Sequence, residues 1–119
     1  MNRIVKLPIS PDQSYAQNWQ CLQLPVLPHQ TKLKTFENCS PAEYVAAVVV
    51  EPLQGEGGFI PAPIEWVKAI REICDKHGIL LIADEVQSGF CRTGRMFATD
   101  YWKEAGVQPD IIATAKSIA

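Results

Sequence analysis

The sequence predicts an α/β fold with a parallel sheet built from βαβ units. Two short runs, residues 45–50 and 79–83, are apolar on both faces and rich in β-branched side chains. That pattern is typical of strands buried inside a parallel sheet. Between the two runs, residues 63–77 repeat apolar side chains at helical spacing, which predicts a helix joining the strands.

The expected helix has recognisable ends. Pro63 suits the first helical position and Glu65 the positive end of the helix dipole. The helix should end near His77, because Gly78 can adopt the left-handed conformation that stops helices. The apolar positions that share one face are Ile64, Val67, Ile70 and Cys74.

A second unit follows, with a helix expected around residues 97–105 and a short strand at 111–114. Glu51, Asp84 and Lys116 then stand at or just beyond the carboxyl ends of successive strands. Ligands bind at that edge of open parallel sheets. We therefore expect a binding site there.

Residues 1–40 differ from the rest of the chain. Prolines at positions 8, 11, 25 and 28 interrupt short apolar stretches, and neither strand nor helix periodicity persists. The expectation is an irregular N-terminal segment of unknown role over residues 1–40, followed by one α/β unit over residues 41–119.

Composition excludes several classes of function. The net charge is −2 and no Lys/Arg cluster occurs, which argues against a nucleic-acid partner. The longest strongly apolar run, residues 45–50, is far shorter than the roughly 20 residues that cross a bilayer. Four widely spaced cysteines without a C-x-x-C pair argue against a metal site. Without a secretory signal, the cysteines predict reduced thiols and a cytoplasmic location.

Three separated blocks carry a specific resemblance. Residues 50–58 read VEPLQGEGG, residues 81–89 read LIADEVQSG, and residues 109–119 read PDIIATAKSIA. In this order and spacing they resemble the class III aminotransferases, most closely the 4-aminobutyrate aminotransferase branch. The resemblance covers about residues 43–119. It implies part of the large domain of a fold-type I transferase, pyridoxal phosphate as cofactor, and a homodimer in the intact family.

The resemblance assigns the two central residues. It implies that Asp84 pairs with the cofactor's ring nitrogen and keeps it protonated, whereas position alone favours a carboxylate capping the next turn. It makes Lys116 the lysine that binds the cofactor covalently and shuttles a proton. The preceding Ala-Thr-Ala run predicts an apolar setting for that amine. A lone lysine is otherwise solvated.

Four further residues receive roles in the same way. Gln87 is expected to donate to the cofactor's phenolic oxygen, and Val86 to pack on a ring face or serve as an ordinary core residue. Glu56 matches a glutamate that pairs with a substrate-reading arginine, with a solvated loop carboxylate as the alternative. Glu51 matches an active-site glutamate near the substrate. Cys91 replaces the small residue usual in relatives and is expected to crowd its loop.

Two functional hypotheses follow from these blocks. The first is a piece of a transaminase that moves an amino group from an ω-amino acid or amine to a 2-oxo acid. The second is an inactive fragment that binds no cofactor, because the family's upstream phosphate loop is not recognisable and its C-terminal part is expected to be missing. A dehydrogenase of the dinucleotide-binding type is rejected, because no glycine fingerprint follows a strand.

Overall fold

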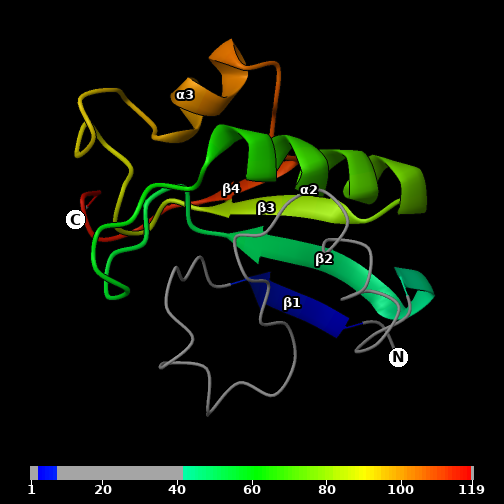
Figure 1. Ribbon diagram of the computed structural model, residues 1–119. Helices are drawn as coiled ribbons and strands as arrows, with labels where there is room; N and C mark the ends of the chain where they lie inside the picture. The colour runs from blue at the N-terminus through cyan, green and yellow to red at the C-terminus, as the bar shows by residue number, and fades with distance from the viewer. Residues whose placement is uncertain (1–2, 8–41, 119) are drawn as a thin grey trace.

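The computed structural model describes residues 3–7 and 42–118, and it contains one parallel sheet. The strands are β1 (Arg3–Leu7), β2 (Val45–Val50), β3 (Leu80–Asp84) and β4 (Ile111–Ala113), paired in that order. Helix α2 (Ile64–His77) connects β2 to β3, and α3 (Thr99–Glu104) connects β3 to β4. All three strand pairs are parallel, so the predicted α/β fold with βαβ units is confirmed (Figure 1).

Strand β1 was not predicted. The expectation that no regular element lies in residues 1–40 is wrong for Arg3–Leu7, which pair with β2 in parallel. The strand is short, carries two basic residues, and pairs with a segment far along the chain, so no local period reveals it. Residues 8–41 lie outside the described residues, and they include most of the N-terminal segment expected over residues 1–40.

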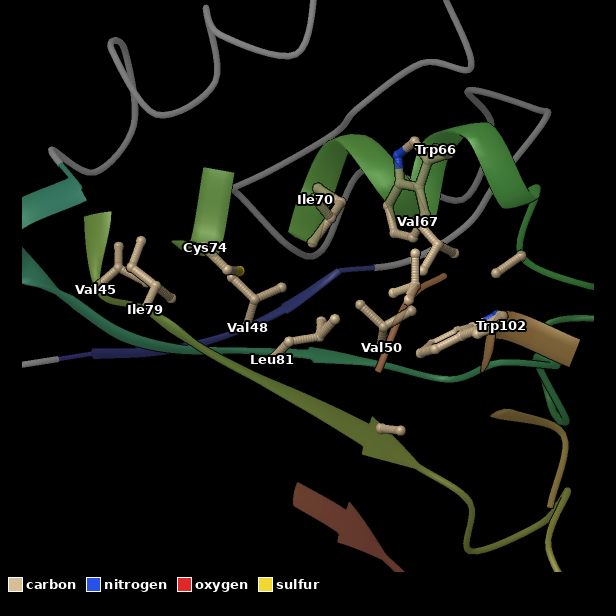
Figure 2. Close-up of a cluster of buried hydrophobic side chains, with 13 residues drawn as sticks. Val45, Val48, Val50, Trp66, Val67, Ile70, Cys74, Ile79, Leu81 and Trp102 are labelled. Atoms are coloured by element: carbon tan, nitrogen blue, oxygen red, sulfur yellow. The ribbon is translucent and has the colours of Figure 1, made fainter. Parts of the chain in front are cut away.

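One hydrophobic core lies between α2 and the sheet. Val48 and Leu81 of the sheet, with Val67 and Ile70 of the helix, are almost completely buried. Figure 2 shows these side chains packed between the helix and the strands, with Trp102 from α3 beside Val50. This packing fixes the relative positions of β2 and β3, and with them the loops that follow each strand.

The C-terminal end of α2 matches the expectation from sequence, whereas Pro63 is not the first helical residue but the extended N-cap before Ile64. The helix stops at Gly78, which has a φ of 66°, and the backbone N–H of Ile79 donates to the carbonyl of Cys74 at 2.9 Å. Cys74 is fully buried, and burial raises the pKa of its thiol to about 11. The thiol therefore stays protonated and packs as a core residue.

Asp110 fastens the start of β4 to its neighbours. Its Oδ2 accepts from Arg71 Nη1 at 2.8 Å and from the backbone N–H of Leu81 at 2.7 Å. Arg71 also binds Asp75 within α2. The hydrogen bond from Arg71, followed by that from Leu81, lowers the pKa of Asp110. One carboxylate thus connects α2, β3 and β4.

An Asp110→Asn variant should lose about 1 kcal/mol of unfolding free energy at pH 7; the loss is limited because the Asp110 side chain is 38% exposed to solvent. The folded-state pKa lies below the unfolded value of about 3.9, so this contribution is present above that pH. It is lost as the pH falls through the folded-state pKa. Urea denaturation at pH 7 and at a pH below the folded-state pKa measures the difference. An equal deficit at both pH values would contradict the assignment to charge.

Two absences hold for the part of the chain that the structure describes. No helix there is long and apolar enough to cross a membrane. No three His, Cys, Asp or Glu side chains within the same residues are grouped so as to hold a metal ion.

Candidate functional site at the carboxyl edge of the sheet

The residues singled out from sequence meet at one edge of the sheet. Because the strands are parallel, β2, β3 and β4 all end there, and Figure 1 shows the loops after β2 and β3 gathered with the C-terminal residues at that end. Asp84 pairs in register with Ala113 of β4. Glu51 follows β2 directly, and Lys116 lies three residues beyond Ala113. Adjacent strands therefore bring Asp84 and Lys116 to the same edge.

Asp84 is the last residue of β3 and is half-buried. Its Oδ1 accepts a hydrogen bond from the backbone N–H of Val86 at 3.2 Å. The turn-capping contact that sequence analysis kept as an alternative is therefore present. It ties the carboxylate to its own turn, and so orients the side chain at the sheet edge.

The loop after β2 is closed by its own hydrogen bonds. Glu51 Oε2 accepts from the backbone N–H of Gly55 at 3.0 Å, and the N–H of Gln54 donates to the carbonyl of Ile60 at 3.0 Å. Glu51 is half-buried, whereas Glu56 at the tip is exposed. Glu51 thus has a structural contact within the loop, and Glu56 is presented to solvent.

Gln87 joins the loop after β2 to the turn after β3. Its Nε2 donates to Glu56 Oε1 at 3.3 Å. The amide also lies directly against Gly55, where an added Cβ would be 2.5 Å from both Cδ and Nε2 of Gln87. The sequence predicted separate roles for Gln87 and Glu56, and the structure brings the two side chains together.

Glu85 is a residue that sequence reasoning missed. It is fully buried, and its carboxylate accepts from the N–H of Thr99 at 2.7 Å, the N–H of Ala98 at 3.1 Å and the hydroxyl of Ser88 at 2.6 Å. The sequence shows two adjacent acids after an apolar strand. It contains no signal for which of the two points inward, because the donors lie up to 14 residues away.

Lys116 occupies an unusual backbone conformation. Its φ is 55°, in the left-handed region that costs a non-glycine residue about 1–3 kcal/mol. The expected apolar setting is not found, because Lys116 and Ala113 are both exposed in the described chain. Arg92 Nε donates to Ser117 Oγ at 3.3 Å, which joins the loop after β3 to the residue beside Lys116. Residues in such conformations gather at functional sites.

The loop after β3 also contains two consecutive left-handed residues, Phe90 with φ 57° and Cys91 with φ 65°. The Phe90 ring packs edge-on against Phe97, with centroids 5.6 Å apart. Cys91 is exposed, so the expectation that its thiol crowds the loop is wrong. The left-handed backbone at Cys91 carries a steric cost that a glycine at this position would not have, whereas the volume of the exposed thiol is accommodated.

Comparison with protein families gives a match over most of the chain. The model of the class-III aminotransferases matches residues 7–119. The match extends into the segment, residues 1–40, that sequence analysis left without a resemblance.

Curated relatives agree with the family model. The 5-aminovalerate aminotransferase DavT of Pseudomonas putida is 54% identical over 86 residues, which is 72% of this chain and 20% of the relative. The 4-aminobutyrate aminotransferase GabT of Escherichia coli is 50% identical over the same fractions of both chains. The chain thus spans 20% of the length of these two relatives.

Solved structures share the fold. An (S)-enantioselective omega-transaminase from Thermomicrobium roseum superposes with a TM-score of 0.62 at 42% identity, covering 71% of this chain and 18% of that one. The ornithine delta-aminotransferase of Plasmodium falciparum superposes with a TM-score of 0.65 at 29% identity, covering 94% and 26%. The chain therefore matches about a fifth to a quarter of much larger molecules.

Proposed function

The chain belongs to the class III aminotransferases, and on this basis we propose that it serves pyridoxal-phosphate-dependent transamination. The proposed reaction transfers an amino group from an ω-amino acid or amine to a 2-oxo acid. One observation carries the proposal: adjacent parallel strands bring a carboxylate, Asp84, and an amine, Lys116, to the same sheet edge.

The side chains at this edge have the chemistry that pyridoxal phosphate requires. Its ring nitrogen needs an anionic partner, its phenolic oxygen a neutral donor, and its aldehyde a primary amine. Asp84, Gln87 and Lys116 offer these three groups in turn. Gly55, which leaves room for the Gln87 amide, fits the same arrangement. When bound, the cofactor supplies an electron sink for the carbon that loses its proton.

Each side chain then has a specific task. Asp84, oriented by the Val86 N–H, holds a proton on the ring nitrogen through its negative charge. Lys116 Nζ would hold the cofactor by condensing with its aldehyde, with the aldehyde oxygen leaving as water, and the freed amine would later carry a proton between carbon centres. Gln87 would donate to the phenolic oxygen, and Val86 would pack on a ring face. The exposure of Lys116 and its place on a turn leave Nζ accessible to solution.

The substrate-facing groups are proposed to be Glu56 and Glu51. Glu56 is exposed at the loop tip and contacts Gln87, so it lies where a substrate next to the cofactor would pass. The two relatives quoted above are named for 5-aminovalerate and 4-aminobutyrate, each with an amine at the end of a carbon chain. An ω-amino donor is therefore the substrate class that we propose, with a 2-oxo acid as acceptor.

The proposed setting is that of the family. We propose that the complete protein acts in the cytoplasm as a homodimer, with residues 41–119 forming part of the large domain. The two cysteines among the described residues, Cys74 and Cys91, are free thiols, which accords with a reducing compartment.

Absorbance spectroscopy tests the proposed function. The full chain incubated with pyridoxal phosphate should develop the visible band of lysine-bound cofactor, and Lys116→Ala should abolish it. Lys76→Ala is the matched control, because Lys76 is an exposed lysine on α2, and it should leave the band unchanged. The alternative hypothesis, a chain that retains the fold but binds no cofactor, predicts no band in any variant.

A Gly55→Ala variant should weaken pyridoxal phosphate binding about as much as Gln87→Ala does, by roughly three- to tenfold. The new methyl group would occupy the space of the Gln87 amide, and only the end of that flexible side chain has to move. The free energy of unfolding should therefore change by less than about 1 kcal/mol. Cofactor titration and urea denaturation of both variants measure the two effects. Unchanged affinity in Gly55→Ala, with a loss in Gln87→Ala, would contradict this contact.

A further inference from the structure

Glu85 is a buried ionisable group that the proposed reaction does not use. Its side chain is fully buried, and placing a carboxylate in such a position is costly unless several donors surround it. Two backbone N–H groups and one hydroxyl meet it at 2.6 to 3.1 Å. Glu85 is therefore held in one orientation by three contacts.

The three donors come from both ends of the loop that joins β3 to α3. Ser88 lies at the near end, three residues after Glu85, while Ala98 and Thr99 lie 13 and 14 residues away at the start of α3. One carboxylate therefore pulls the two ends of the loop together. Glu85 thus links residues 85 and 99, a connection that we call the clamp, and also caps the start of α3.

The turn at the near end is tight, and it contains the residues proposed to meet the cofactor. The backbone N–H of Gly89 donates to the carbonyl of Glu85 at 2.9 Å. A Cβ at Gly89 would lie 2.8 Å from that same carbonyl oxygen, so the turn requires glycine there. Val86 and Gln87 lie between these anchored ends, and their backbone positions follow from the Glu85 and Ser88 contacts.

We propose that Glu85 is a positioning residue for Gln87: its buried carboxylate holds the 86–88 turn so that the Gln87 amide faces the cofactor site. The clamp itself is a property of the protein alone, whereas its effect on the cofactor rests on the proposed function. The same two hydrogen bonds, from the N–H groups of Ala98 and Thr99, also serve helix α3. Its N-cap residue, Ala98, has no side-chain acceptor, so the first N–H groups of the helix depend on Glu85.

Glu85→Gln removes the charge with little change in size. In Glu85 one carboxylate oxygen accepts from the Thr99 N–H and the other from the Ala98 N–H. A glutamine side chain has only one acceptor oxygen, so one of these buried N–H groups loses its partner. Ser88→Ala is the milder variant, because it deletes one donor and leaves the carboxylate in place. Glu72→Gln, on the exposed face of α2, is the matched control. If Glu85→Gln fails to fold, Ser88→Ala supports the same comparison.

Hydrogen exchange of the full chain without cofactor tests the clamp. Amides of residues 86–89 should exchange roughly tenfold faster in Glu85→Gln, and less so in Ser88→Ala, because one buried hydrogen bond is lost. The amides of α2 in both variants, and all amides in the Glu72→Gln control, should exchange at the wild-type rates. Equal rates in residues 86–89 of wild type and Glu85→Gln would overturn the proposal.

A pH titration of the cofactor band separates positioning from a purely structural role. Glu85→Gln should shift the titration midpoint in the same direction as Gln87→Ala and weaken cofactor binding about tenfold. A lower melting temperature with a wild-type midpoint would overturn the positioning role. If the wild type shows no band, the proposed function fails, and the exchange rates still decide whether Glu85 holds Gln87.

Discussion

An Asp84→Asn variant should bind pyridoxal phosphate about ten- to a hundredfold more weakly than the wild type and react with 5-aminovalerate at least about a hundredfold more slowly. Asparagine keeps an oxygen that can accept from the Val86 N–H, so the turn after β3 is preserved. What it removes is the negative charge that holds a proton on the ring nitrogen. The loss should therefore appear in cofactor chemistry and not in the fold.

Cofactor titration and the decay of the visible band after addition of the amine measure both effects. Asp75→Asn is the matched control, because its carboxylate is exposed on α2, away from the sheet edge. The control should bind and react like the wild type. Wild-type affinity and rate in Asp84→Asn would show that this carboxylate only caps its turn, the alternative that the sequence left open.

A Trp102→Ala variant should lose about 3–5 kcal/mol of unfolding free energy. The side chain is 2% exposed and is the residue through which the short helix α3 joins the main core (Figure 2). Without it, α3 keeps only the Glu85 contacts at its N-terminal end and loses its side chain in the hydrophobic core. The loop that depends on the α3 amides should loosen together with the helix.

Urea denaturation at neutral pH measures this loss. Tyr101→Ala, one position earlier and 40% exposed, is the aromatic control. It removes the Tyr101 contacts with Arg95 and Thr93 at the surface, and should cost no more than about 1 kcal/mol. If Trp102→Ala costs no more than Tyr101→Ala, the helix does not depend on this contact.

The fold could be predicted where the signal is local. β2 and β3 are short apolar runs, and α2 has helical periodicity with a glycine stop, so their positions follow from sequence to within a residue or two. β1 could not be predicted in the same way. Its five residues read Arg-Ile-Val-Lys-Leu, which has no strand or helix period, and the strand pairs with β2, a contact between distant segments that no window of sequence displays.

The sequence predicted the part of the candidate site that lies at the ends of the strands. Parallel strands place Glu51, Asp84 and Lys116 at one edge, and the sequence shows where each strand stops. The contacts between loops could not be predicted. The packing of Gln87 on Gly55 and the burial of Glu85 depend on how two loops fold against each other, which local propensity does not determine.

The exposure of Lys116 illustrates the same limit. The apolar residues before it suggested a buried amine, yet the chain turns at Lys116 with a left-handed backbone and presents the side chain to solution. The apolar run predicts the strand, but it does not predict the backbone conformation of the turn that follows. Beside that turn, Arg92 contacts Ser117 from a separate loop, a contact that the local sequence does not show.

The most direct test is to locate the covalent attachment. The full chain is incubated with pyridoxal phosphate, reduced with borohydride, digested and analysed by mass spectrometry. We expect a pyridoxyl group on the peptide that contains Lys116, and much less of it when Asp84 is replaced by Asn. Attachment chiefly to another lysine, or equal labelling of Lys116 in both proteins, would contradict a single cofactor site shared by these two side chains.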